Sequence, residues 1–563
     1  MDELVTARQS FVSALRQYNR ACLAATKAYG LSNGLDGDSP LLLNVIAQEM
    51  QAIPSYESNL QKLRITLSQC RNSVRTISPI NALLAEILAQ IFQLVHSFAS
   101  FATRSPDYWS AEEGHISKKR AIAPDALSQV CTRWRRVTLG MPELWTHIDL
   151  SNSSEQLLES LLARGQMFSH RSSSWPLSLC FTVTSDLSTG LRHAGETIGE
   201  FNRVAARRLR SLELRTWTGL GGFEKLLGSN MAVTTLGILE ELIITNHTTG
   251  NCNLPCAARR SASLMARTVR PDHYLNSKLQ AISRLTLEGV FFPWSSPADK
   301  GLVEFRILAG KQLQIPISHH QLSALLSASP GLRVFLFDLA IENFDPGSEF
   351  YPVHLEELEE VNIRQMPVWL ASDYERQELL LSLLTPGSKS LSLSMSISIS
   401  GSYASHYGDM LPSEVHSFLE RSNTTRLYIT VIEHPHENFK LLSFARILAE
   451  LSARPMNLSV LGLDHSYNFL EDAKLVTTVQ PCPVSIHTLV LHEGMFNMTS
   501  LQELIAACSI QKLVARGCSF RGMGNQNVYE ELVKMAPVVK YSRGSPQKYC
   551  PIDEWAHCGH LDW

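Results

Sequence analysis

The chain has 563 residues, too many for a single hydrophobic core, so two or more structural units are expected. Apolar residues make up 44% and charged residues 18%, a composition that excludes a largely disordered chain. The formal net charge of -3 excludes a global attraction to nucleic acid or to an anionic membrane.

The sequence carries no recognisable targeting segment. Its first residues, MDELVTARQS, lack the basic and then apolar order of a secretory signal, and no stretch of about 18 apolar residues predicts a transmembrane helix. We therefore expect a protein that is not secreted, lies in the cytoplasm, the nucleus or both, and has no nucleic-acid or membrane partner. The 11 scattered cysteines are then expected to be mostly small buried residues and not a disulfide framework.

Residues 1–76 are predicted to form a helical, coiled-coil-like region. A first apolar stripe lies within residues 2–29, and a second run is expected to stop at Pro54. A third run, from Leu60 to Ile77, alternates gaps of three and four in a heptad seam. Two alternatives remain for its partner: a helical hairpin within the chain, which the short seam favours, or a coiled-coil dimer.

Residues 77–148 contain a long apolar helix pattern and two shorter blocks. Ser78 and Pro79 are suited to the start of a helix, whose apolar face continues to Val95. After a polar insertion near 97–124, Val130, Trp134 and Val137 are predicted to share one helical face. Pro142 is expected to end that helix or to begin a short turn, and Leu144 and Trp145 follow as exposed or anchoring residues.

Taken together, the three blocks resemble an F-box. That family shows a pattern of the form L-P-x-E-I-L-x-x-I-F, then V-C-x-x-W-R, then P-x-L-W. The matching residues here are Leu83, Glu86, Ile87, Leu88, Ile91, Phe92, Val130, Cys131, Trp134, Arg135, Pro142, Leu144 and Trp145. The sequence departs from the pattern at two places: Leu84 replaces the proline, and an insertion separates the first two blocks. The insertion can loop out without disturbing the packed helices, because a longer loop costs little additional free energy.

The resemblance implies a module that docks on a Skp-type adaptor and, through it, on the cullin of a ubiquitin ligase. A few apolar anchors would carry the docking. The anchors that the resemblance implies are Leu83, Ile87, Leu88, Ile91, Phe92, Val130, Trp134, Leu144 and Trp145. Some of these must fill the core of the module, and Trp134 is expected to do so.

Residues 149–563 repeat a short L-x-x-L-x-L element, often with a helical stretch between copies. The alternation in its last positions is typical of a strand. The copies begin at Leu209, Leu239, Ile282, Leu332, Leu358, Leu391, Leu427, Leu458, Ile486 and Ile510. The spacing is irregular, and the segment is similar to the irregular leucine-rich-repeat domains found behind F-boxes. The competing interpretation is an ordinary α/β domain with a parallel sheet and crossover helices.

The predicted fold class is therefore α/β overall: a helical hairpin, an all-α F-box, and an irregular leucine-rich-repeat solenoid. The strand face of the solenoid is expected to bind an unknown protein substrate. Phe291, Phe292 and Trp294 are exposed candidates for that contact, unless they cap a neighbouring repeat.

No sequence motif supports catalysis, so we expect no catalytic residue, cofactor or metal. The glycines near Gly221 lack a phosphate-binding pattern, and the cysteines and histidines of residues 550–560 lack zinc-knuckle spacing. Two functions remain open. One is a substrate-recognition adaptor of a ubiquitin ligase, and the other is a repeat scaffold whose F-box-like helices only cap the solenoid.

Overall fold

The computed structural model divides into two compact units, Met1–Leu88 and Ala89–Trp563, each treated by itself below. The structure describes residues 2–31, 40–73, 79–102, 124–150, 155–183, 201, 205–216, 238–246, 280–292, 294, 300–309, 316–342, 352–364, 380–399, 413–433, 451, 457–465, 485–521 and 528–542. Within these ranges no helix is both long and apolar enough to cross a membrane.

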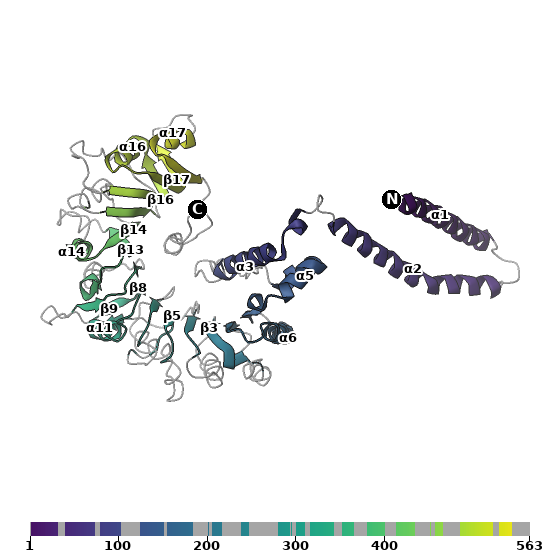
Figure 1. Ribbon diagram of the computed structural model, residues 1–563, viewed down its shortest axis with the longest axis horizontal. Coiled ribbons are helices and arrows are strands. Elements are labelled where there is room, and N and C mark those ends of the chain that lie inside the picture. Colours follow the sequence, from purple (N-terminus) through teal and green to yellow (C-terminus); the bar gives the residue numbers. More distant parts are fainter. Residues whose placement is uncertain are drawn as a thin grey trace. The chain divides into compact units, whose positions relative to one another are not determined.

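The first unit begins with two long helices, α1 (Asp2–Leu31) and α2 (Pro40–Ser73), which run in opposite directions (Figure 1). The Tyr18 hydroxyl donates a hydrogen bond to Glu49 Oε2 over 2.7 Å, and the rings of Tyr18 and Tyr56 meet edge to face with centroids 6.4 Å apart. The prediction that a helix stops at Pro54 is wrong. Proline removes one backbone donor, but α2 continues through it for a further five turns.

The heptad seam of α2 is not covered within the chain, contrary to the favoured prediction. Leu60, Leu63 and Leu67 keep 44%, 56% and 53% of their surface exposed. The hairpin itself forms, but α1 contacts α2 at Glu49 and Tyr56 and leaves the leucines accessible. The apolar pattern was therefore correct, whereas the inference about what buries it was wrong.

The helix predicted from Pro79 begins later. Residues Pro79–Ala82 form a single 3-10 turn, η1, and the α-helix α3 spans Ala85–Ala102. The backbone N–H of Leu83 donates to the Ile80 carbonyl, which closes the turn and directs the chain into α3. Leu84, where the F-box pattern has proline, directly precedes this helix. The later start shows that the substitution does not extend the helix toward Pro79.

In the second unit, three short helical elements precede the sheet: α4 (Pro124–Val130), α5 (Thr132–Leu139) and η3 (Pro142–Trp145). The expectation that Pro142 begins a turn is confirmed. Residues 103–123, most of the predicted insertion, lie outside the described residues.

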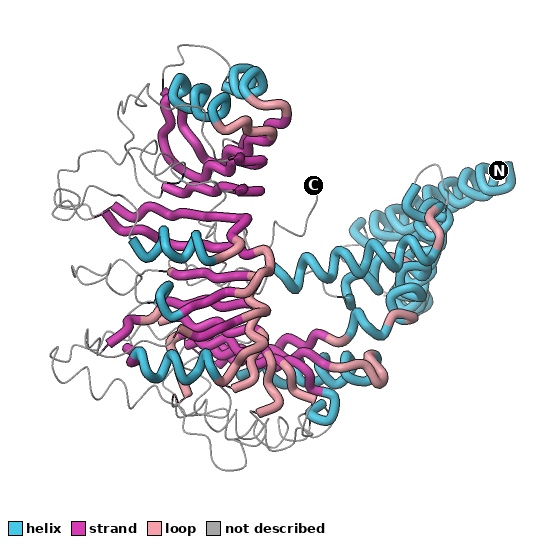
Figure 2. The backbone as a smooth tube through the Cα atoms, turned by 60° about the vertical axis from the view of Figure 1, so that its left-hand side comes forward, coloured by secondary structure: helices cyan, strands magenta, loops and turns pink. Residues whose placement is uncertain are grey.

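The second unit is built on one large sheet (Figure 2). Its 14 described strands are parallel and follow each other in sequence order. The strands are β1 (His147–Asp149), β2 (Leu177–Val183), β3 (Leu209–Thr216), β4 (Glu241–Asn246), β5 (Arg284–Glu288), β6 (Glu304–Leu308), β8 (Val334–Asp338), β11 (Glu360–Ile363), β13 (Leu391–Ile399), β14 (Thr424–Glu433), β15 (Asn457–His465), β16 (Ser485–Asn497), β17 (Lys512–Arg521) and β18 (Val538–Ser542). Two small parallel pairs stand apart, β7 (Pro316–Ser318) with β9 (Ala340–Glu342) and β10 (Val353–Leu355) with β12 (Leu384–Pro386). The sheet order never reverses, whereas a doubly wound domain reverses its order at a switch point.

The register aligns the apolar residues of the strands in continuous rows. One such row crosses the whole sheet and is formed by Ile148, Leu179, Leu212, Leu242, Leu285, Phe305, Phe335, Val361, Leu393, Leu427, Leu461, Leu489, Leu513 and Val539. From Ile148 to Leu513, each member of the row is at most 1% exposed. No strand buries its own side chains alone, because each row is completed by the strands on both sides.

Helices pack against the sheet and enclose this row. They are α6 (Glu155–Arg171), α11 (His319–Ser327), α14 (Ser413–Arg421), α16 (Met498–Ala507) and α17 (Val528–Met535). In Figure 1, α6, α11 and α14 lie on the same side of the sheet. Helix α11 starts with a capping box, in which Ser318 and Gln321 satisfy each other's backbone N–H groups. The predicted helices near 319–327, 413–421 and 498–507 are thus confirmed.

Of the 14 strands of the large sheet, β1, β2, β6 and β18 were not predicted, nor were the four strands of the two small pairs. Strand β6 has the same spacing as the predicted copies, through Leu302, Phe305 and Ile307. The expectation that Phe291 and Phe292 are exposed is wrong, since they are 3% and 2% exposed and the Phe291 ring lies 5.7 Å from that of Trp294. These aromatic residues belong to the core.

Candidate functional site

In the second unit, the end of the first F-box-like block, from Ala89 onward, meets the second and third blocks through specific contacts. The rings of Phe92, on α3, and Trp134, on α5, have centroids 4.9 Å apart. Gln93 Nε2 donates to Glu143 Oε1 over 2.8 Å, which joins the first block to the third. Trp145 Nε1 donates to the Thr138 carbonyl over 2.9 Å, which joins the third block to the second. Segments separated by up to about 50 residues therefore form one packed cluster.

The second block contains a break that the sequence analysis did not foresee. Cys131 is extended, with φ -158° and ψ 170°, and its Sγ accepts a hydrogen bond from the Trp134 backbone N–H over 3.4 Å. It thereby caps the start of α5 in the way that serine or aspartate usually does. The prediction that Val130 shares a helical face with Trp134 and Val137 is wrong, because Val130 ends the preceding helix, α4.

The predicted docking residues divide into three groups by burial. Exposed apolar side chains are Ile87 at 41% and Val130 at 56%. Leu83, Ile91 and Trp134 are half-buried. The buried members, each at most 1% exposed, are Leu88, Phe92, Leu144 and Trp145. The expectation that Leu144 and Trp145 are exposed or anchor a partner is therefore wrong, and both contribute to the protein core.

Two further exposed leucines were missed. Leu94 is 59% exposed and lies seven positions after Ile87 on α3, so two successive turns of this helix present apolar side chains. Leu139, at the end of α5, is 41% exposed. Spacing from Ile87 was the signal that could have identified Leu94. Leu84, considered only as a departure from the pattern, is the most exposed apolar residue of this segment at 68%.

Trp145 also joins the F-box-like cluster to the sheet. Its ring meets Phe168 of α6 edge to face with centroids 5.0 Å apart, and the Arg171 guanidinium carbon lies 4.4 Å from its ring centroid. Arg164 of α6 pairs with Asp125 of α4 over 2.8 Å. Strand β1 then begins two residues after Trp145. The third block is therefore part of the first structural layer of the sheet domain.

His96 of α3 gives this cluster a pH dependence. Burial, with a smaller effect of the nearby His147, lowers the pKa of His96 from 6.5 to about 4. The folded protein thus holds His96 neutral where the unfolded chain would bind a proton. The contribution of His96 to the free energy of unfolding is therefore fully present above pH 6.5. It is lost as the pH falls toward 4, by up to about 1.4 kcal/mol per pH unit.

We expect the urea midpoint to fall less between pH 7 and pH 5 for His96→Gln than for the wild type, because the variant has no imidazole to protonate. Unfolding followed by tryptophan fluorescence at each pH measures this difference. An equal fall in both proteins would contradict the role assigned to His96.

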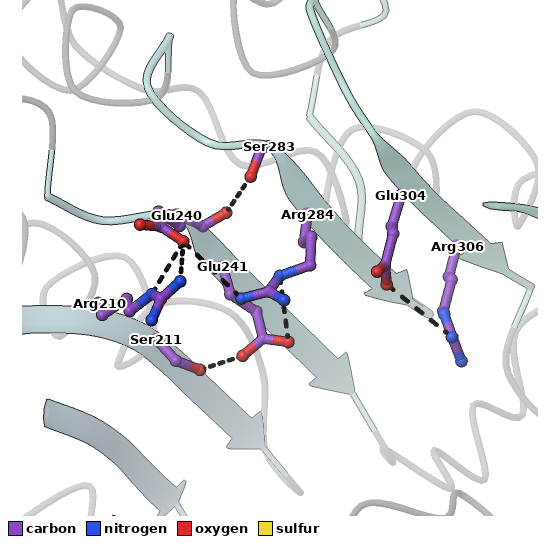
Figure 3. A network of polar contacts seen from close by, with 8 residues as sticks. All are labelled: Arg210, Ser211, Glu240, Glu241, Ser283, Arg284, Glu304 and Arg306. Carbon is purple, nitrogen blue, oxygen red and sulfur yellow. Dashed lines mark hydrogen bonds and ion pairs between the residues drawn. The ribbon is translucent and has the colours of Figure 1, made fainter. Parts of the chain in front are cut away.

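The sheet face opposite the apolar row carries a charged network near the start of β3–β6 (Figure 3). The register places Ser211, Glu241, Arg284 and Glu304 in one cross-strand row. Arg284 Nε lies 3.9 Å from Glu241 Oε1, and the alternating charges along the row stabilise neighbouring strands. Beside this row, the Arg210 guanidinium binds Glu240 over 2.8 Å.

The centre of the same face is polar, and its side chains are buried. Neighbouring residues Asn362 and Ser394 are 1% and 6% exposed, and Thr430, one strand further along, is 7% exposed. Within the described part of the chain, Asn362 Oδ1, Ser394 Oγ and Thr430 Oγ1 have no hydrogen-bond partner. Buried polar atoms without partners cost free energy, so these three groups lower the stability of this part of the sheet.

A second polar row crosses the same face two residues further along the strands, where Ser396 is paired with Thr430. Asp464 and His492 follow on β15 and β16, in register, and His492 Nδ1 lies 3.2 Å from Asp464 Oδ1. Both side chains are almost fully buried. An acid–histidine pair does not by itself define a catalytic site.

No cluster of metal-binding side chains occurs among the described residues. The glycines near Gly221 and the cysteines and histidines of residues 550–560 lie outside the described residues. A comparison of the chain with protein-family models and with curated proteins finds no match.

Proposed function

We propose that this protein is a substrate-recognition adaptor of a Skp–cullin–F-box type ubiquitin ligase, without catalytic activity of its own. The observation that carries the proposal is the cluster formed by the three motif blocks, through Phe92–Trp134, Gln93–Glu143 and Trp145–Thr138. These contacts bring together motif residues that are far apart in sequence, as is needed for a packed module that resembles an F-box. The adaptor would act by holding a substrate close to the conjugating enzyme, which raises its effective concentration.

The apolar side chains that remain exposed on this segment are suited to docking on a Skp-type protein. At least 41% of the surface is exposed for each of three side chains: Ile87 and Leu94 on α3, and Val130 at the end of α4. Such side chains contribute most binding energy where a partner removes them from water. The buried residues of the motif would instead hold the three helices in place.

We further infer that the parallel sheet is an irregular leucine-rich-repeat solenoid and that its polar face binds the substrate. Sequential strands, continuous apolar rows and packed helices are what stacked repeats produce. The charged side chains of Arg284, Glu304 and Arg306, which keep 35%, 34% and 26% of their surface exposed on this face, support a partner that brings polar or charged groups.

A repeat scaffold without ligase function is the second candidate, and one observation favours it. Trp145 packs on Phe168 of α6, and β1 follows immediately, so the F-box-like helices also close the first end of the sheet. Capping and docking use different side chains, because capping needs Trp145 whereas docking needs Ile87 and Val130.

Recovery of a purified Skp-type adaptor on the immobilised full chain separates the two candidates. We expect the wild type to retain it, and the double variant Ile87→Asp, Val130→Asp to lose at least tenfold, because two exposed apolar contacts become charged. Val533→Asp is the matched control, since Val533 of α17 is also exposed, at 47%, and lies outside the motif. Equal recovery by the double variant and the control, or none by the wild type, would support the scaffold.

A further inference from the structure

The largest concentration of exposed apolar side chains in the described residues lies on α1 and α2. Exposed members on α2 alone are Val45, Ile46, Met50, Ile53, Tyr56, Leu60, Leu63, Ile65 and Leu67. Soluble proteins seldom leave such a continuous surface open, because every exposed apolar group costs about 25 cal/mol per Å² relative to burial. A stripe of this length indicates a helical partner.

The spacing along α2 shows which face the partner covers. Ile53, Leu60 and Leu67 are seven positions apart, and Tyr56, Leu63 and Cys70 form the second line of the same seam. Helix α1 meets this seam through Tyr18, which contacts Tyr56 and Glu49. Ile53, Leu60 and Leu67 are left 42%, 44% and 53% exposed on the other side.

We propose that α2 pairs with α2 of a second copy of this chain in an antiparallel coiled coil, with Leu60 opposite Leu63 of that copy. The alignment is self-complementary. It places Ile53 opposite Cys70 and Leu67 opposite Tyr56, so each apolar residue of the described seam between Ile53 and Cys70 meets another. Both copies present the same sequence, which is the condition for a two-fold dimer.

Charge selects the direction of the pair. Glu57 and Arg64 flank the seam on the same side of α2, one on either side of Leu60 and Leu63. In the antiparallel alignment Glu57 of each copy lies beside Arg64 of the other. In a parallel pair the flanking neighbours would be Ala52 with Glu57 and Asn59 with Arg64, which give no opposite charges. Flanking charges are what set orientation in coiled coils.

The mass of the full-length protein in solution tests the pairing. Light scattering coupled to size exclusion should give twice the chain mass of 62.8 kDa for the wild type. The double variant Leu60→Glu, Leu63→Glu should give the single-chain mass. Ile65→Glu is the matched control: Ile65 is 49% exposed on the same helix but faces away from the seam, so this variant should remain a dimer.

Circular dichroism of each variant shows whether the helices persist. A monomeric wild type, or loss of the dimer in Ile65→Glu as well, would overturn the proposal. Because neither docking on the Skp-type adaptor nor the sheet enters this measurement, it is independent of the proposed ligase function.

Disulfide cross-linking tests the direction. With Cys22→Ser in every variant and an added thiol oxidant, Ile53→Cys should form a dimer whose disulfide, located by peptide mass mapping, joins residue 53 of one copy to Cys70 of the other. Ile53→Cys with Cys70→Ser should form no disulfide at residue 53, because residue 53 of one copy lies far from residue 53 of the other. A mapped disulfide between the two residues 53 would show a parallel pair, and no mapped disulfide from residue 53 in either variant would show that this seam is not the interface. Either result refutes the antiparallel alignment.

Discussion

Trp145→Ala is expected to lower the free energy of unfolding of the second unit by about 3–5 kcal/mol. The Trp145 side chain is 0% exposed and fills the space between α5 and α6. Its loss leaves a cavity, removes the donor to the Thr138 carbonyl, and uncovers Phe168 and Arg171. Trp145 thus connects the second and third motif blocks to the first helix of the sheet domain.

Urea unfolding followed by circular dichroism measures this loss as a lower midpoint. Trp175→Ala is the control, because that tryptophan is 49% exposed and its removal should change the midpoint little. If Trp145→Ala lowers the free energy of unfolding by less than about 1 kcal/mol, the ring is not part of a cooperative core. Loss of adaptor binding in this variant would follow from unfolding, which is why docking is better tested at Ile87 and Val130.

Phe335→Ala is expected to have a similarly large effect in the middle of the sheet. Phe335 is 0% exposed, and its ring stacks on Phe305 of β6 with centroids 6.2 Å apart and contacts Phe337 at 5.7 Å. Truncation interrupts the apolar row between β6 and β11 and should cost about 3–5 kcal/mol. Phe305 on β6 and Val361 on β11 would then each lose the neighbouring side chain that links them in this row.

The adjacent Val334→Ala is the control for this prediction. Val334 lies on β8 next to Phe335 but points to the opposite face, where it is only half-buried. Its truncation should cost no more than about 1 kcal/mol. Differential scanning calorimetry of both variants compares them directly, and equal costs would contradict the assignment of Phe335 to the core row.

Most of the fold could be predicted from periodicity. Helices α1, α11, α14 and α16 and the strands with leucine copies follow from gaps of three and four or of two, which depend only on local geometry. Strand β6 was overlooked although Leu302, Phe305 and Ile307 have the spacing of the predicted copies, and β1 was missed because three residues are too short for a pattern. Pro54 was read as a helix end, but one lost backbone hydrogen bond does not stop a helix that is favoured on both sides.

The candidate site was harder to predict because burial is a long-range property. A motif shows that Trp145 and Ile87 are both apolar, yet only the fold separates the first, which is buried, from the second, which is exposed. The break at Cys131 depends on one sulfur accepting from the Trp134 backbone, and no spacing rule identifies it. Likewise, the buried polar side chains of Asn362 and Ser394 become neighbours only through the register of β11 and β13.

The contact between Trp145 and Phe168 has a consequence for how such a chain can evolve. A module that is exchanged between proteins must end where its own core ends, and here the core of the F-box-like segment is completed by α6. A recombination point at residue 148 would divide a shared core and leave the indole ring exposed to water on one side. The segment and the first repeat are therefore expected to be inherited as a unit, and their residues at this contact to change together.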